Sequence, residues 1–212
     1  MKTKIVSLIM AFGLFNAAFA NSAKIGYASD FFYRGEQKAL ESVQAAIDLE
    51  QDVAGLIASF HACTNQSVDS GVDSYGLSAG LGASVADLIF VHGGFYHFED
   101  LPGQALSEVQ VKGSLNVFAN PAVSAFRNTS DELYTFEGSL SDSFDVGFAN
   151  LDLRGSLGNT DVTETNNRTY YSVGGGLSRE LGDAVASVSV DLVDSDDIER
   201  EFVFATSINF NF

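Results

Sequence analysis

The sequence has 212 residues, a formal net charge of -17 and one cysteine, Cys63. So acidic a chain does not suit a nucleic-acid-binding protein, which needs a basic surface, and one cysteine excludes an intramolecular disulfide. Apolar residues make up 46% of the chain and are spread evenly along it. This spread is typical of a protein with many strands in which every second residue is apolar.

The first 20 residues have the pattern of a secretory signal peptide. Two lysines precede an apolar run from Ile5 to Phe19, which ends in Ala-Phe-Ala, a small-x-small cleavage site. A membrane-spanning helix is the alternative, but the run is short and Asn16 interrupts it. We expect residues 1–20 to be a signal peptide and residues 21–212 to form one domain. No later stretch could form a spanning helix, so membrane insertion would be through strands.

The first two strands are predicted from their alternation. Lys24 to Arg34 is the first, and a polar loop is expected from there to about Glu41. Ser42 to Gln51 is the second, in which apolar residues alternate with polar ones. A helix is the alternative over residues 39–49, which are good helix formers, but the strict alternation favours a strand.

The rest of the chain continues the pattern. Further strands are expected at residues 53–64, 74–84, 88–99, 106–118, 122–128, 132–141, 144–157, 168–179, 184–193 and 202–212. The phase of the strand at 88–99 is open because both faces are apolar. The strand at 144–157 changes parity, so it has either a β-bulge near residues 148–150 or apolar residues facing inward. Tight turns are expected near Asp52, Ala86, Asn120, Asp142 and Gly182, and longer loops near Glu36, Asp69, Pro102, Asp161 and Asp196.

The closing stretch from Phe202 to Phe212 shows the clearest alternation. One face carries Phe202, Phe204, Thr206, Ile208, Phe210 and Phe212. With twelve strands in six hairpins, the pattern predicts an all-β fold, a transmembrane antiparallel up-and-down β-barrel of about 12 strands. Ten or fourteen strands are alternatives, and a soluble β-sandwich is the rival fold. We expect the closing strand to pair with Lys24 to Arg34 and seal the barrel.

Both ends of the chain resemble TorF-family porins. The opening IGYASDFFYRG has Ser29, Asp30, Arg34 and Gly35 in common with the family's opening motif, with Phe31 where Tyr is usual. VDLVDSDD and EFVFATSINFNF are similar to the family's closing hairpin. The resemblance implies a small porin-like barrel of the Gram-negative outer membrane, and it attaches no substrate.

Charged residues on the predicted interior faces are the candidate pore-lining residues. Because they carry both signs, they suit either a closed barrel held by ion pairs or a narrow polar channel. The acidic excess predicts a modest preference for cations, and any narrowing is expected from Arg34, Arg154 and Phe32. The ten candidates are Asp30, Arg34, Asp48, Glu50, Glu108, Lys112, Glu137, Asp152, Arg154 and Asp191.

We therefore expect an outer-membrane porin for passive diffusion of small solutes or ions, without enzymatic activity or cofactor. A closed structural or surface-binding barrel is the first alternative, based on acidic loops around residues 161–164 and 194–199. A hydrolase is the second alternative, but no local sequence motif links the three histidines of this chain to a nucleophile. Expected partners are outer-membrane lipid, lipopolysaccharide and, through Phe202 to Phe212, the barrel-assembly machinery. Interfacial girdles are expected at Tyr27, Tyr33, Tyr75, Tyr134 and Tyr171.

Overall fold

The structure is a computed structural model that describes residues 20–68, 73–101, 104–163 and 165–212. The expected signal peptide lies outside these residues except for Ala20, which begins the first strand. The strands are β1 Ala20–Tyr33, β2 Glu36–Val53, β3 Leu56–Ser67, β4 Asp73–Val85, β5 Ile89–Leu101, β6 Gln104–Leu115, β7 Ala122–Asn128, β8 Tyr134–Asp145, β9 Asn150–Thr163, β10 Asn166–Leu181, β11 Ala184–Ser195 and β12 Ile198–Asn211.

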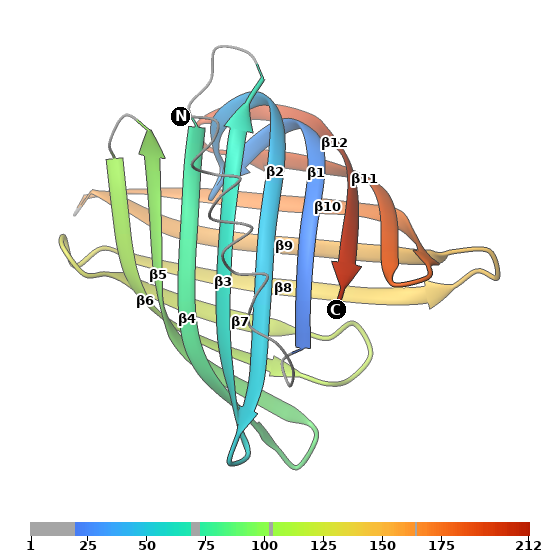
Figure 1. The fold of residues 1–212 in the computed structure, drawn as a ribbon. Helices are drawn as coiled ribbons and strands as arrows, with labels where there is room; N and C mark the ends of the chain where they lie inside the picture. Colours follow the sequence, from blue (N-terminus) through green and yellow to red (C-terminus); the bar gives the residue numbers. More distant parts are fainter. Residues whose placement is uncertain (1–19, 69–72, 102–103, 164) are drawn as a thin grey trace.

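The twelve strands close into one barrel (Figure 1). Each strand pairs antiparallel with the next, and β1 pairs with β12. The predicted fold class and strand number are confirmed, and residues 39–49 belong to strand β2 rather than to a helix. Where β1 and β12 pair, from Ser22 to Ala28 and from Ala205 to Asn211, closure removes the sheet edge, so the backbone groups there are satisfied within the sheet.

Among the residues that the structure describes, no helix is long and apolar enough to span a membrane.

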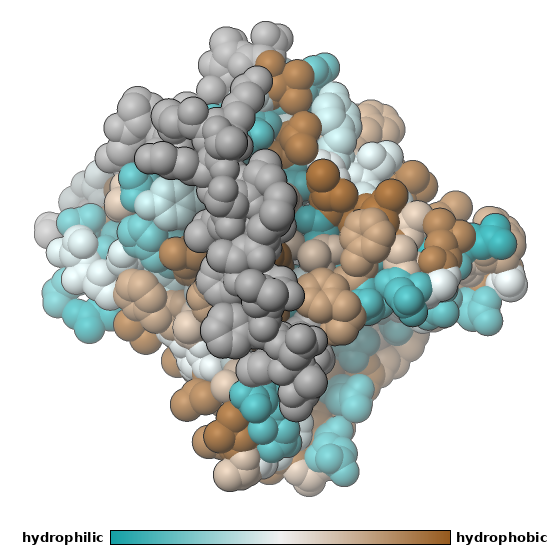
Figure 2. Space-filling view, viewed as in Figure 1, coloured by the Kyte–Doolittle hydropathy of each residue, from teal (hydrophilic) through white to brown (hydrophobic). Residues whose placement is uncertain are grey.

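The outer and inner faces of the barrel differ as the alternation predicts. On β12, Phe202 and Phe204 are 62% and 61% exposed, whereas Val203 between them is 9% exposed. Large apolar side chains are exposed on the other strands as well, for example Val111 and Leu157. In Figure 2, apolar side chains form patches on the visible face, most clearly to the right of centre, and polar ones gather at the protruding right-hand end. A closed barrel with an apolar exterior is suited to a lipid bilayer.

The predicted alternation of short turns and longer loops is wrong. Arg34-Gly35 is a two-residue turn with φ of 51° and 74°, which suits the twist of a hairpin. Asp196-Asp197 also forms a two-residue connection, and Asp161 lies inside β9. The strands extend further than expected because polar residues at their ends pair with one another beyond the apolar band. The expected loops around residues 69–72 and at Pro102-Gly103 lie outside the described residues.

The parity change near residue 148 has a simple origin. The turn expected near Asp142 occurs instead at residues 146–149, so Phe144 belongs to the end of β8. Strand β9 begins only at Asn150, and within it Leu153 and Leu157 are exposed on the outer face. Asp152 and Arg154 consequently lie on the inner face, and no bulge is needed to explain the pattern.

Candidate functional site in the barrel interior

Strand β1 leaves the barrel wall after Ala28. Its pairing with β12 runs from Ser22–Asn211 to Ala28–Ala205, so the expectation that β12 pairs with the whole of Lys24 to Arg34 is wrong beyond Ala28. At this point Ser29 Oγ accepts a hydrogen bond from the backbone N–H of Phe204 (3.0 Å). The serine thereby satisfies a backbone donor that β1 no longer pairs.

Strand β2 joins the wall at the matching level. Its pairing with β3 begins at Ser42–Ser67, and the preceding Glu41 has a φ of 47°. Residues 29–41, including the Arg34-Gly35 turn, therefore form a two-stranded ribbon that pairs with no other strand among the described residues; only at its end does the Glu41 carbonyl accept from the Val68 N–H. We call residues 29–41 the inward hairpin because its tip contacts strands on the far side of the barrel.

The tip of the inward hairpin is held by an ion pair across the interior. The Arg34 guanidinium donates to both carboxylate oxygens of Glu108 on β6, at 2.5 Å each, and to Thr135 Oγ1 on β8 at 3.2 Å. It also lies 4.4 Å from the ring centroid of Phe126 on β7. The side chains of Arg34 and Glu108 are only 11% and 3% exposed. A bidentate, buried pair of this kind has a fixed geometry.

Aromatic packing fixes a second side of the tip. The Tyr33 ring stacks on Phe98 of β5, with centroids 4.5 Å apart and an interplanar angle of 1°. The expectation that Tyr33 serves an interfacial girdle is therefore wrong, although Tyr27 and Tyr134 are exposed. A register shift between Phe31 and Phe32 and the departure from the wall turn this part of β1 away from lipid.

A chain of ion pairs surrounds the base of the tip, at the end of the barrel opposite Ala20 and Phe212. Lys38 contacts Glu36 at 2.8 Å and Asp100 of β5 at 3.0 Å. Arg168 of β10 contacts Glu36 at 3.5 Å and also pairs with Asp197. The side chains of Lys38 and Asp100 are 11% and 10% exposed, so this pair is shielded from solvent, whereas Glu36 and Asp197 are about half exposed, as in ordinary surface pairs.

The inward hairpin separates two cavities. The inner cavity has a volume of about 500 Å³ and is lined mainly by β1, β9, β10, β11 and β12. The mouth cavity, about 430 Å³, lies toward the end opposite Ala20 and Phe212 and is lined by Asp100, Asp131, Asp161 and their neighbours. Among the described residues, Arg34 is the one that lines both.

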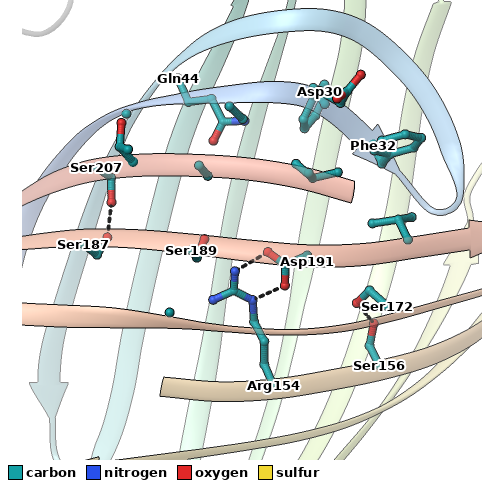
Figure 3. A pocket seen from close by; sticks show the side chains of 18 of the residues that line it. Asp30, Phe32, Gln44, Arg154, Ser156, Ser172, Ser187, Ser189, Asp191 and Ser207 are labelled. Carbon is teal, nitrogen blue, oxygen red and sulfur yellow. Dashed lines mark hydrogen bonds and ion pairs between the residues drawn. The ribbon is translucent and has the colours of Figure 1, made fainter. Parts of the chain in front are cut away.

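A second ion pair crosses the wall of the inner cavity. In Figure 3, Arg154 reaches toward Asp191; its Nε donates to Asp191 Oδ1 at 2.7 Å, and Nη2 pairs with Oδ2. These residues lie on β9 and β11, and Gly174 of β10 is in register with both. A Cβ on Gly174 would overlap Asp191 Oδ1. The glycine therefore leaves the space through which the pair forms.

Replacing Gly174 with alanine is expected to displace Asp191 and break its pair with Arg154. The added Cβ would also lie 2.5 Å from the carbonyl oxygen of Val190, and overpacking of this kind costs about 1–3 kcal/mol. Urea unfolding of the barrel in detergent, followed by circular dichroism, measures the loss. Gly138→Ala is the control, because a Cβ there meets nothing within 4 Å; equal losses in the two variants would contradict the expectation.

The other candidate residues are placed on the interior at different depths. Asp30 accepts from Gln37 (2.9 Å), Glu137 from Tyr170 (3.0 Å) and Asp152 from Ser143 (2.7 Å), and all three line the inner cavity. Asp48 contacts His61 at 2.6 Å. Lys112 lies on β6 in register with His92, whereas Glu50 is exposed near the turn that ends β2. The ten candidates thus do not form one ring, and their role in permeation stays a prediction.

The three histidines make polar contacts with side chains on strands β2 to β6. Ser59 Oγ and His92 Nε2 are 3.0 Å apart, while His61 contacts Asp48 and His97 contacts Ser107. Gly80 of β4 provides the space for the His92 ring. Within the described residues, no group of three or more His, Cys, Asp or Glu side chains is placed to hold a metal ion.

Sequence reasoning missed several residues of the inward hairpin's environment. Thr135, Phe98 and Arg168 come from different strands and become neighbours only through the fold. The available signal was the Tyr33-Arg34-Gly35 sequence, since a glycine after an arginine suits a two-residue turn.

No family model matches the sequence, and no curated protein is significantly similar to it. Solved structures are similar in fold. The KdgM porin has a TM-score of 0.63 at 10% identity, over 90% of this chain and 99% of that one. The NanC porin has 0.59 at 11%, over 91% and 100%, and the COG4313 outer membrane channel from Pseudomonas putida F1 has 0.59 at 10%, over 93% and 97%. The fold is that of bacterial outer-membrane β-barrels, and with the apolar outer face it places this barrel in that membrane.

Proposed function

We propose that the protein is an outer-membrane porin that lets small solutes or ions diffuse passively. The observation that carries the proposal is the presence of two cavities lined in part by charged residues, of about 500 and 430 Å³, inside a closed barrel. Barrels of this size lie between small ones filled by side chains and wide porins with a water channel. The porin fold of the similar structures supports the same role.

A modest preference for cations follows from the charges around the cavities. The described residues lining the mouth cavity include five acidic and three basic ones, and those lining the inner cavity four acidic and three basic ones. Ion pairs neutralise part of this charge, so the preference is weak. A KdgM porin has been solved with oligogalacturonate, an acidic sugar; the acidic excess here disfavours solutes of that charge.

The proposal is tested by zero-current potentials across planar bilayers separating unequal KCl solutions. We expect the sign that indicates potassium over chloride, and a larger permeability ratio at 0.1 M than at 1 M salt. The reason is screening, because the Debye length falls from about 10 Å to about 3 Å over this range. A measured preference for chloride would contradict the predicted cation preference. Absence of conductance would contradict the porin role and favour a closed structural barrel.

The TorF resemblance gains support from the inward hairpin. The four motif residues that this chain shares with the family all lie in it. Ser29 accepts from the Phe204 N–H, Asp30 from Gln37, Arg34 pairs with Glu108, and Gly35 packs against Tyr170. We propose membership of that family on these residues. Sequences of the family that conserve the motif but lack an acid at the position of Glu108 would count against it.

We propose no enzymatic activity. Among the described residues, Asp48 contacts His61 and Glu99 contacts His97. In the same part of the chain, the contact between Ser59 and His92 has no carboxylate beside it to orient the histidine as a general base would need. Ester hydrolysis by the refolded protein would overturn this part. Lipopolysaccharide, lipid and the barrel-assembly machinery remain proposed partners; crosslinking of β12 to the assembly machinery in cells tests the last of them.

A further inference from the structure

We propose that the tip of the inward hairpin is the constriction of the pore, and that the Arg34–Glu108 pair keeps the constriction electrically neutral, so that removing either charge makes it selective for ions of one sign. This inference rests on the diffusion role proposed above. Arg34 borders both cavities, so a solute that crosses where the two cavities adjoin passes beside its guanidinium. The barrel is narrowed here by backbone as well as by side chains, because the turn itself lies in the interior.

The Arg34 side chain is held by hydrogen bonds and by aromatic rings. Glu108 and Thr135 bind the guanidinium nitrogens, and the rings of Phe126 and Tyr33 lie 4.4 and 5.1 Å from its central carbon. The next residue, Gly35, is as confined. A Cβ added there would lie 2.6 Å from Tyr170 Cβ and 2.8 Å from Ser195 Cβ, and Ser195 Oγ donates to the Gly35 carbonyl at 2.8 Å. A rigid, closely packed tip is what a selective constriction requires.

The charge at the constriction is balanced in the native protein. Arg34 and Glu108 cancel, which leaves selectivity to the weaker field of the other cavity residues. Removing one partner leaves a single uncompensated charge where every permeating ion passes. An isolated charge about 4 Å from an ion changes its occupancy about fivefold even with the full screening of water. The effect has opposite signs for the two partners.

The test measures permeability ratios for Arg34→Gln, Glu108→Gln and the double variant in planar bilayers. Arg34→Gln is expected to raise the potassium-to-chloride ratio about fivefold or more, Glu108→Gln to lower it by a similar factor, and the double variant to return it to the native value. Arg154→Gln and Asp191→Asn are matched controls, since this pair has the same charges but lines only the inner cavity. Their shifts should be clearly smaller.

A steric variant tests the constriction without changing charge. Gly35→Ala and Gly55→Ala each place alanine at a left-handed position, with φ of 74° and 84°, in a two-residue turn. Only the first meets packed neighbours; a Cβ on Gly55 meets nothing within 4 Å. We expect Gly35→Ala to displace the tip and raise single-channel conductance at least about twofold, and Gly55→Ala to leave it unchanged.

The outcomes separate the two proposals. A conducting native protein whose permeability ratio and conductance do not respond to the Arg34, Glu108 and Gly35 variants would overturn the constriction and leave the porin role intact. The constriction would also be overturned if Arg154→Gln and Asp191→Asn shift the permeability ratio as much as Arg34→Gln and Glu108→Gln do. Absence of conductance in the native protein and in every variant, Gly35→Ala included, would overturn the porin role and with it this inference.

Discussion

Glu108→Gln is expected to lower the free energy of unfolding by about 3–5 kcal/mol, because it leaves the Arg34 cation buried without a carboxylate. Glu108 is 2% exposed, and its two oxygens take both guanidinium bonds at 2.5 Å. The Gln side chain keeps the shape but carries one acceptor oxygen and no charge. Urea unfolding in detergent, followed by far-ultraviolet circular dichroism, measures the loss; the chain has no Trp for fluorescence.

The double variant Arg34→Met/Glu108→Leu is the control for this prediction. Replacing both members of a buried ion pair by apolar residues of similar size is often neutral or stabilising. We therefore expect the double variant to recover most of the stability that Glu108→Gln loses. A double variant as unstable as the single one would show that the cost comes from packing around Phe126 and Thr135 rather than from the stranded charge.

Val111→Arg is expected to cost about 2–4 kcal/mol in a lipid bilayer, the range for a basic residue on the lipid face near the midplane. Val111 is 55% exposed and lies in the middle part of β6, in register with Gly93 and Ala125. Its neighbours offer no carboxylate in that register. Folding into lipid vesicles at increasing urea concentrations, measured by the gel shift of the folded form, reports the change.

Gln110→Arg is the matched control on the same strand. Gln110 is the adjacent residue, points to the opposite face and is in register with Gly94 and Phe126. The same new charge is there in contact with the polar interior, so the cost should stay below about 1 kcal/mol. Equal costs at the two positions would contradict the assignment of outer and inner faces on β6.

The wall of the barrel could be predicted because its determinants are local. Alternation along the closing strand reports the two faces of each strand wherever one contacts lipid and the other polar side chains. The exposed Phe202 and Phe204 and the buried Val203 follow it directly. The same rule located most strands but misplaced several ends, because polar residues such as Asp161 pair beyond the apolar band without a change of period.

The inward hairpin could not be predicted because its determinants are distant. Nothing in the residues around Arg34 indicates that β1 stops pairing with β12 at Ala28; that depends on Ser29 reaching the Phe204 N–H, 175 positions away. Alternation continues along the hairpin, but at its tip Tyr33 packs on Phe98 and Arg34 on Phe126 inside the barrel, so the usual meaning of the pattern is lost there. Charge pairs such as Arg154–Asp191 likewise depend on the register of three strands.

The contacts of the inward hairpin also constrain the order in which parts of the barrel can fold. Its tip contacts β5, β6, β7, β8, β10 and β11, so its docking site does not exist until those strands are in place. The hairpin itself is local, because β1 and β2 are joined by two residues and form early. Its docking depends on contacts between distant parts of the chain, which form late. We therefore expect the first hairpin of the chain to enter the interior only after the strands that contact its tip are in place.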